Sequence, residues 1–255
     1  PTAQRLARDI RDMGYRVVIL NRGYRAKWHG DVGVVSDGKR LHMDAAEAGD
    51  EAYMLAKHLP NVPVLIGAER AITGQYAIDH FGAEVAILDD GYQHWQLHRD
   101  LDVVLVDTLN MFGNGSILPR GTLREPLKNL SRADLFLLTK CDQSSPISRA
   151  TLCDQLHRYK PNAPIVESIH KPCAFIEIAD WYKNDGSKAL PLEALKGQEV
   201  MVFSAIGNPS SFEQTMAGEG LQIAEAIRYP DHHDYGMVEM QYIMERAISK
   251  RVTAL

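Results

Sequence analysis

The stretch Val85-Ala-Ile-Leu-Asp-Asp-Gly-Tyr-Gln-His94 decides how this chain folds, because four apolar residues lead directly into two adjacent carboxylates. A short, unbroken apolar run is typical of a strand buried on both faces, as in a parallel sheet. Ligands of open α/β sheets bind at the carboxyl ends of such strands, which is where Asp89 and Asp90 stand. Two carboxylates suit Mg²⁺, which takes few protein oxygens and shares the rest with water and phosphate. Asp90-Gly91 is equally typical of a surface turn, so these residues alone leave both interpretations open.

Helical and strand patterns alternate on both sides of this stretch. Apolar residues at helical spacing or in short runs predict helices over 2–13, 45–59, 71–81, 148–159, 209–218 and 237–250, and strands over 15–20, 32–36, 62–66, 85–88, 102–107, 135–139, 199–204 and 221–227, with a β-like segment over 165–179. Strands that alternate with helices predict an α/β fold with a mainly parallel sheet.

Composition limits the classes of protein to which the chain can belong. Its 255 residues suffice for one large or two ordinary domains, and a net charge of −5 argues against a general nucleic-acid binder. Residues 1–40 nevertheless carry nine Lys/Arg against four Asp/Glu, a basic region that suits phosphates or an anionic membrane surface, or a merely solvated helix face. Three cysteines without metal-binding spacing indicate a reducing compartment. No apolar run approaches the ~20 residues that a membrane-spanning helix needs.

Residues 108–130 form a long segment rich in Gly and Pro between two predicted strands. Loops of this length in compact domains are usually functional or disordered. This one carries Arg124 and Glu125 between apolar residues, so we favour a function.

Several short motifs, taken in order, resemble those of one enzyme family. They are Asn21-Arg-Gly-Tyr24, Ala48-Gly-Asp-Glu51, Asp89-Asp-Gly-Tyr-Gln-His94 with Arg99-Asp100, Phe112-Gly-Asn-Gly115, Leu123-Arg-Glu-Pro126 and Tyr229-Pro-Asp-His232. Together they resemble the tetraacyldisaccharide 4'-kinase family. The chain departs mildly from the family pattern, with Asn21 where Ser is usual, Tyr92 where Phe is usual, and Arg120 and Thr122 where Ala and Pro are commoner.

The resemblance implies a P-loop-kinase-like fold, with a nucleotide-binding core in residues 1–163 and a smaller C-terminal α/β domain in residues 164–255. It implies an ATP- and Mg²⁺-dependent kinase of lipid A biosynthesis that phosphorylates the 4'-hydroxyl of an acylated glucosamine disaccharide 1-phosphate. It also implies a monomer in peripheral contact with the cytoplasmic face of a Gram-negative inner membrane, with a lipid partner and no nucleic acid.

The resemblance also implies a role for each candidate site residue. Asp89 and Asp90 would hold Mg²⁺, and Glu51 would add a carboxylate to the metal's surroundings. Arg124 would neutralise charge on the transferring phosphoryl group, because its planar fork suits phosphate, and Glu125 would orient Arg124.

Three further residues complete the implied site. Arg22 is a weaker candidate for phosphate binding, at the end of a predicted strand. Asp50 paired with His232 is the implied proton acceptor, although Asp50 alone is equally typical of a helix first turn and His232 of an ordinary turn. Five apolar side chains could form a surface for acyl chains or could simply pack in the core or loops. They are Trp28, Trp95, Met111, Phe112 and Ile117.

In the family, a Gly-rich Lys-Thr loop stands just before the position that Pro1 occupies here. We therefore expect the first strand, that loop, any upstream membrane-binding helix and the closing strand to lie outside this chain. We also expect the complete protein to be the kinase and the 255-residue segment alone to be inactive.

Two other functions remain open at this point. Thr139-Lys-Cys-Asp142 follows a predicted strand and resembles the guanine-reading motif of GTPases. A non-catalytic α/β binding module is the second alternative. Nucleotide preference and the sequence that precedes Pro1 would separate these functions from the kinase.

Overall fold

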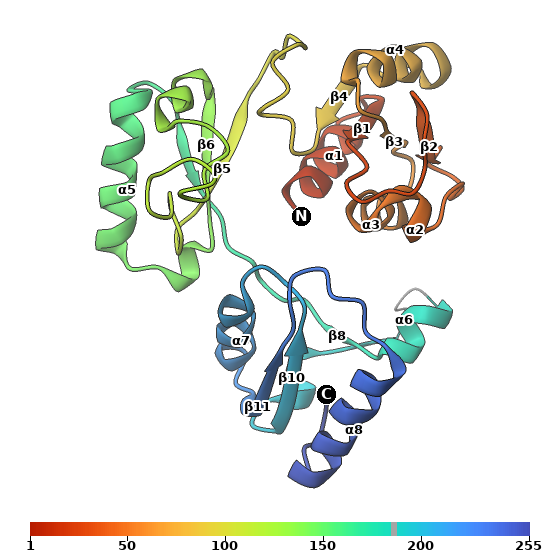
Figure 1. Ribbon diagram of the computed structural model, residues 1–255, viewed down its shortest axis with the longest axis vertical. Helices are drawn as coiled ribbons and strands as arrows, with labels where there is room; N and C mark the ends of the chain where they lie inside the picture. Colours follow the sequence, from red (N-terminus) through yellow and green to blue (C-terminus); the bar gives the residue numbers. More distant parts are fainter. Residues whose placement is uncertain (185–187) are drawn as a thin grey trace. The chain divides into compact units, whose positions relative to one another are not determined.

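The computed structural model describes residues 1–184 and 188–255, which form two compact units, unit 1 (residues 1–102) and unit 2 (residues 103–255). Unit 1 contains a β-sheet with helices on both of its faces (Figure 1). Its elements are α1 (Thr2–Asp12), β1 (Val17–Asn21), β2 (Gly33–Ser36), α2 (Ala45–Ala48), α3 (Asp50–His58), β3 (Val64–Ile66), α4 (Arg70–Phe81) and β4 (Val85–Leu88).

The sheet of unit 1 has the strand order β2-β3-β1-β4. β1 runs parallel to both β3 and β4, whereas β2 is antiparallel to β3, so the sheet is mixed. Leu20 pairs with Leu88, and Asn21 pairs with Ile66. This register brings the carboxyl ends of β1, β3 and β4 to one edge of the sheet.

Successive side chains of β1 enter two different cores, because side chains alternate between the two faces of a strand. Val17 and Ile19 pack on the face covered by α1 and α3, whereas Val18 and Leu20 pack on the face covered by α4. All five residues of β1 are buried, as the apolar run predicts.

Two details of unit 1 differ from the sequence-based expectations. β4 is an edge strand whose Ala86 is exposed, so the prediction that this run is buried on both faces is wrong for unit 1. The helix predicted over 45–59 is broken at Gly49. Gly49 has φ = 83°, and a Cβ there would lie 2.5 Å from the carbonyl oxygen of Tyr24, so the loop after β1 takes the place that a continuous helix would need.

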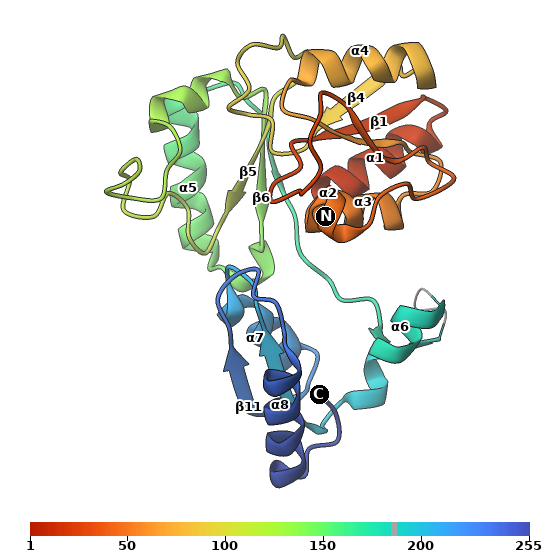
Figure 2. The same ribbon diagram turned by 45° about the vertical axis from the view of Figure 1, so that its right-hand side comes forward.

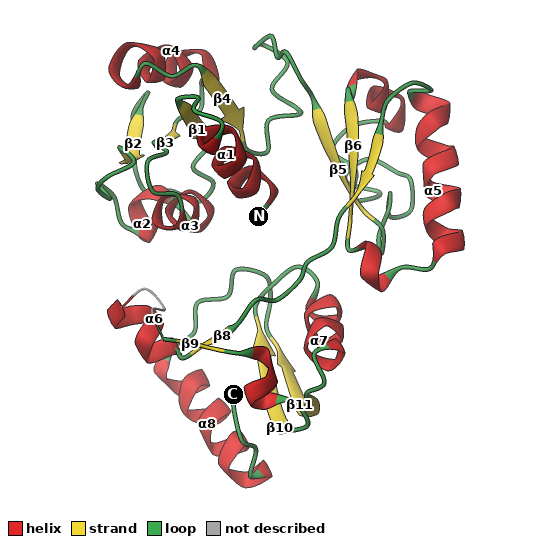
Figure 3. Ribbon diagram, turned by 180° about the vertical axis from the view of Figure 1, so that it is seen from behind, coloured by secondary structure: helices red, strands yellow, loops and turns green. Residues whose placement is uncertain are grey.

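Unit 2 begins with a three-stranded parallel sheet in the order β5-β6-β7. Figure 3 shows this sheet beside α5, and Phe136, Leu138, Leu152 and Leu156 are fully buried between them. The elements are β5 (Val103–Asp107), η1 (Leu127–Arg132), β6 (Leu135–Thr139), η2 (Cys141–Gln143), α5 (Pro146–Tyr159) and β7 (Ile165–Glu167).

The rest of unit 2 is built on the parallel pair β10 (Glu199–Ser204) and β11 (Gln222–Arg228). Figure 2 shows this pair with α7 (Pro209–Gly218) and α8 (Met237–Lys250). Val200 and Val202 pack with α7, whereas Met201 packs with α8, again by alternation along the strand. Shorter elements precede them: β8 (Phe175–Ile176), α6 (Ile178–Asn184), β9 (Ala189–Leu190) and η3 (Leu192–Leu195).

The α/β class and the predominance of parallel pairing are confirmed. The boundary between the two compact units lies between residues 102 and 103, and β4 and β5 belong to different sheets. The predicted domain boundary at 163/164 falls inside unit 2. That domain boundary stays a prediction. Among the described residues, no helix is both long and apolar enough to cross a bilayer.

Candidate active site

Polar side chains meet at the carboxyl edge of the unit 1 sheet. Asn21, the last residue of β1, is buried, and its Nδ2 donates a hydrogen bond to Asp89 Oδ2 at 3.1 Å. Asn21 Oδ1 accepts a hydrogen bond from the backbone N–H of Gly23 at 2.8 Å, which fixes the turn that begins at Arg22. One amide side chain therefore ties the loop after β1 to the carboxylate after β4.

Asp89 and Asp90 differ in their surroundings. The backbone N–H of Asp89 donates to the carbonyl of Leu20 at 3.1 Å, which extends the pairing of β1 and β4 by one residue. Asp90 is exposed and has φ = 52°, the left-handed conformation of a tight turn. Of the two interpretations that the sequence left open, the turn is present, and it displays the two carboxylates at the sheet edge where ligands bind.

Arg70 is a buried cation at the same edge, and sequence reasoning missed it. Its side chain is only 3% exposed, and its Nη1 donates to the backbone carbonyls of Gly67 and Ala68. Its Nε is buried without a hydrogen-bond partner in the part of the chain that the structure describes. A signal was available, because an arginine at the start of a helix opposes the helix dipole and requires another reason to be there.

Burial lowers the pKa of Arg70, and the positive charge of Arg22 lowers it further. The carboxylates of Asp90 and Asp89 act in the opposite direction. Arg70 therefore lies within electrostatic reach both of the acidic pair and of Arg22, so this edge carries charges of both signs.

The loop after β1 is also bonded to the helical corner that carries Asp50 and Glu51. The backbone N–H groups of Lys27 and Trp28 donate to carbonyls of α2 at 3.0 and 3.2 Å, and Gly49 contacts the backbone of Tyr24. Asp50 and Glu51 are exposed on the first turn of α3. The structure thus connects the segments of Arg22 and Asp50 through backbone contacts.

Arg124 and Glu125 lie in unit 2, on the loop between β5 and η1. Glu125 accepts hydrogen bonds from Asn129 Nδ2 at 2.7 Å and Arg132 Nη2 at 3.0 Å, and its side chain is 12% exposed. Arg124 is exposed. Glu125 is therefore an anchor between the loop and η1, a role that sequence reasoning did not assign to it.

His232 lies on the turn that follows β11 and has φ = 58°. Its backbone N–H donates to the carbonyl of Ala205 at 3.2 Å, and its side chain is half-buried. The next residue, His233, stacks on Tyr229 with ring centroids 4.8 Å apart, and Tyr235 contacts both rings edge-on. These aromatic contacts fix the turn that presents His232.

The Thr139–Asp142 motif lies at the carboxyl ends of β5 and β6. Lys140 Nζ forms an ion pair with Asp107 Oδ2 at 2.6 Å, and the Thr108 hydroxyl donates to the carbonyl of Thr139 at 2.9 Å. The lysine thus joins the two strand ends, and Asp142 is exposed.

The candidate residues divide between the two units. Unit 1 holds Arg22, Asp50, Glu51, Asp89 and Asp90, and unit 2 holds Arg124, Glu125 and His232. Convergence of the two groups on one nucleotide stays a prediction. Among residues 1–184 and 188–255, no three His, Cys, Asp or Glu side chains lie close enough together to hold a metal ion.

Comparisons with known proteins agree on one family. A family model described as tetraacyldisaccharide-1-P 4'-kinase matches residues 1–254. Tetraacyldisaccharide 4'-kinase of Syntrophus aciditrophicus is 38% identical over 252 residues, which are 96% of this chain and 66% of that protein. Its counterpart in Anaeromyxobacter sp. strain K is 41% identical over 247 residues, 97% of this chain and 63% of that protein. The chain thus spans about two thirds of the length of these curated relatives.

One solved structure is similar over most of the chain. A crystal structure described as the "apo" form of LpxK from Aquifex aeolicus in complex with ATP has a TM-score of 0.71 and 33% sequence identity. The similarity covers 92% of this chain and 68% of that one.

Proposed function

This chain belongs to the tetraacyldisaccharide-1-P 4'-kinase family, and from that premise we propose that the complete protein moves the γ-phosphate of ATP onto the 4'-hydroxyl of an acylated glucosamine disaccharide 1-phosphate. This reaction is a step of lipid A biosynthesis. The observation that carries the proposal is the acidic pair Asp89–Asp90 at one sheet edge, where Asn21 donates a hydrogen bond to Asp89 and the buried Arg70 interacts electrostatically with both carboxylates. Phosphoryl transfer needs positioning and charge neutralisation, which such an edge supplies.

The proposed cofactors are ATP and Mg²⁺, on a P-loop-kinase-like fold. The similarity to a kinase structure that contains ATP supports the nucleotide. The donor chemistry fits Mg²⁺, which prefers carboxylate oxygens and completes its coordination with water and substrate phosphates. Asp89 and Asp90 would be the protein's share, and Glu51 would act through water. When bound, Mg²⁺ neutralises charge on the β- and γ-phosphates.

Arg124 is the proposed cation for the transferring phosphoryl group. Its guanidinium suits phosphate because the planar fork donates two parallel hydrogen bonds. The anchoring of the neighbouring Glu125 by Arg132 and Asn129 supports this role, since it holds the backbone of the loop at residue 124. Arg22, exposed on the Asn21–Tyr24 loop, is proposed as a second contact to phosphate.

Asp50 and His232 are proposed to accept the proton of the 4'-hydroxyl together. An imidazole hydrogen-bonded to a carboxylate is a suitable general base near neutral pH. The exposure of Asp50 at the start of α3 and the fixed turn that carries His232 support the assignment.

The acylated acceptor is the proposed partner, and it would bring the protein, as a monomer, to the cytoplasmic face of the inner membrane. The ion pair between Lys140 and Asp107 favours a structural role for the GTPase-like motif, because it occupies the lysine that such a motif would use on a nucleotide.

The test is a kinase assay on the complete protein and on the 255-residue chain, with Mg-ATP and the acylated disaccharide 1-phosphate. We expect Asp50→Asn, Asp90→Asn, Arg124→Ala and His232→Ala each to lower kcat by ~10²-fold or more, the size typical of lost electrostatic or acid–base groups. Matched controls on exposed positions of α5 are Asp154→Asn, Arg158→Ala and His157→Ala, which we expect to retain full activity. Loss of less than about tenfold for Asp90→Asn would exclude metal binding there.

A further inference from the structure

The loop between β5 and η1 is preorganised by its own hydrogen bonds. Leu118 N donates to Leu123 O at 2.9 Å, Leu123 N donates to Ser116 O at 3.2 Å, and Asn114 Nδ2 donates to Arg120 O at 2.9 Å. A Cβ at Gly121 would lie 2.1 Å from the carbonyl oxygen of Ser116, so the loop closes on itself as tightly as glycine allows. This segment therefore has a built geometry despite its length.

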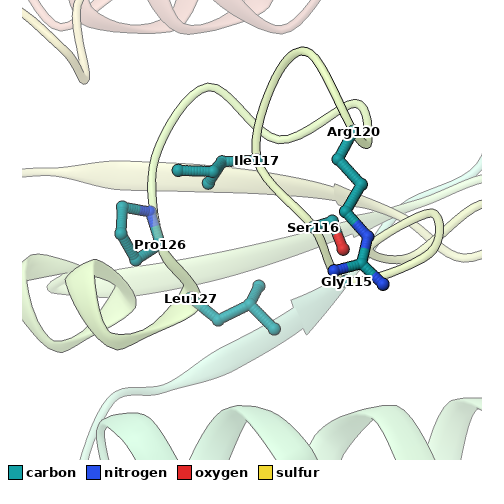
Figure 4. Close-up of a pocket in the computed structure, with 6 residues that line it drawn as sticks. All are labelled: Gly115, Ser116, Ile117, Arg120, Pro126 and Leu127. Carbon is teal, nitrogen blue, oxygen red and sulfur yellow. The ribbon is translucent and has the colours of Figure 1, made fainter.

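This loop and the start of η1 border an open surface cavity of about 400 Å³. Its lining consists of Gly115, Ser116, Ile117, Arg120, Pro126 and Leu127. Figure 4 shows the Arg120 side chain extended along Ser116 and Gly115, with Pro126 and Leu127 across the cavity from it. One wall is thus cationic and polar, and the other is apolar.

The charge and the apolar surface of this cavity lack partners inside the protein. Among the described residues, the guanidinium of Arg120 makes no hydrogen bond and no ion pair, and no acidic side chain lines the cavity. Ile117 is 47% exposed, and Leu118 beside it is 62% exposed. An unpaired guanidinium next to exposed aliphatic side chains matches a ligand that joins an anion to a hydrocarbon chain.

We propose that this cavity binds the phosphate monoester of an acylated lipid, with the phosphate on Arg120 and Ser116 and an acyl chain on Ile117 and Leu118. The planar guanidinium suits phosphate, and a serine hydroxyl adds a donor. The identity of that lipid as the acceptor of the reaction, bound through its 1-phosphate, rests on the function proposed above. Arg120 is then a specificity-determining residue of this chain.

The binding test uses the 255-residue chain and vesicles of phosphatidylcholine, with and without phosphatidic acid as the phosphomonoester. We expect Arg120→Ala to weaken binding to the phosphatidic acid vesicles by roughly five- to tenfold at low salt and to leave binding to phosphatidylcholine unchanged. Arg120→Lys should keep part of the affinity, since it keeps the charge and loses the fork. Arg158→Ala, an exposed arginine on α5, is the control and should bind as the wild type does.

Two further arms identify the ligand. Ile117→Ser should weaken vesicle binding and leave the binding of inorganic phosphate, measured by calorimetry, unchanged. Equal binding of inorganic phosphate and of phosphatidic acid vesicles would refute the lipid, and wild-type binding by Arg120→Ala would refute the site. Unchanged circular dichroism of both variants establishes that they fold.

A kinase assay of the complete protein separates this proposal from the function. Arg120→Ala should raise KM for the acylated acceptor by the same factor as in vesicle binding, with KM for ATP unchanged. If the complete protein has no kinase activity while vesicle binding still depends on Arg120, the proposed kinase function is refuted and the proposed lipid-binding cavity is supported. If the kinase is active and Arg120→Ala leaves the acceptor KM unchanged, the cavity does not bind the acceptor.

Discussion

Replacement of Arg70 by methionine tests what this buried cation contributes to the stability of unit 1 and to cation binding at the carboxyl edge of its sheet. Methionine fills most of the volume of the buried side chain without its charge. The change removes the hydrogen bonds to the carbonyls of Gly67 and Ala68, and Gly67 is itself buried. An unsatisfied buried acceptor costs about 1–3 kcal/mol, part of which is offset because a desolvated cation is also removed.

We therefore expect Arg70→Met to lower the free energy of unfolding by about 1–2 kcal/mol. A unit of 102 residues loses about 4–8 °C in Tm per kcal/mol, so the melting temperature of unit 1 should fall by about 5–15 °C. Differential scanning calorimetry measures this shift. Arg22→Met is the matched control, because Arg22 is exposed at the same edge and should leave Tm unchanged.

The same substitution should act in the opposite direction on cation binding. Removal of a positive charge beside Asp89 and Asp90 relieves repulsion of a divalent ion by about 1 kcal/mol in a solvent-exposed setting, so Mn²⁺ should bind roughly fivefold more tightly. Electron paramagnetic resonance of free Mn²⁺ measures this affinity. An Arg70→Met variant with the same melting temperature as the wild type, or with weaker Mn²⁺ binding, would refute the reasoning about Arg70.

Three other predictions concern separate features. Backbone N–H groups lower the pKa of Asp37 to about 2 from its ordinary 3.8, so Asp37 stabilises the fold above pH 4 and loses that contribution as the pH falls to 2. The difference in unfolding free energy between the wild type and Asp37→Asn, measured in urea, should therefore vanish between these pH values. Gly49→Ala should destabilise unit 1 by about 2 kcal/mol or more, because φ of Gly49 is positive and the new methyl group would lie 2.5 Å from the carbonyl oxygen of Tyr24. Urea titration measures this loss, and an unchanged midpoint would contradict the contact. Burial raises the pKa of Cys141, so iodoacetamide at pH 8 should label the exposed Cys173 first, as judged by mass spectrometry, and faster labelling of Cys141 would show that unit 2 opens locally.

Local patterns predicted most of the elements of this fold. The apolar runs that became β1 and β6, and the periodic segments that became α1, α4 and α8, lie within a few residues of their expected places. These predictions succeeded because strand and helix periodicities are properties of the adjacent residues themselves.

Pairing between distant segments was harder to predict. Whether β4 is an edge strand depends on which strand lies beside it, and an apolar run has the same appearance in both cases. The break at Gly49 depends on the backbone of Tyr24, which approaches from a different segment of the chain. Long-range contacts of this kind leave only a weak trace in local sequence.

The candidate site shows the same division. Asn21 and Asp89 lie at one edge because β1 and β4 run parallel, and a hydrogen bond joins them. Arg70 was missed because an arginine near the start of a helix is ordinarily a surface residue, and only its burial reveals its place beside the acidic pair. The resemblance matched Glu125 to its neighbour Arg124, whereas the structure bonds Glu125 to Arg132, seven residues further along the chain.

The contact between Gly49 and Tyr24 makes the loop after β1 and the first turn of α3 one mechanical piece. Backbone hydrogen bonds from Lys27 and Trp28 to α2 hold the two segments together. We therefore expect a substitution that reshapes one of these two segments to shift the other as well.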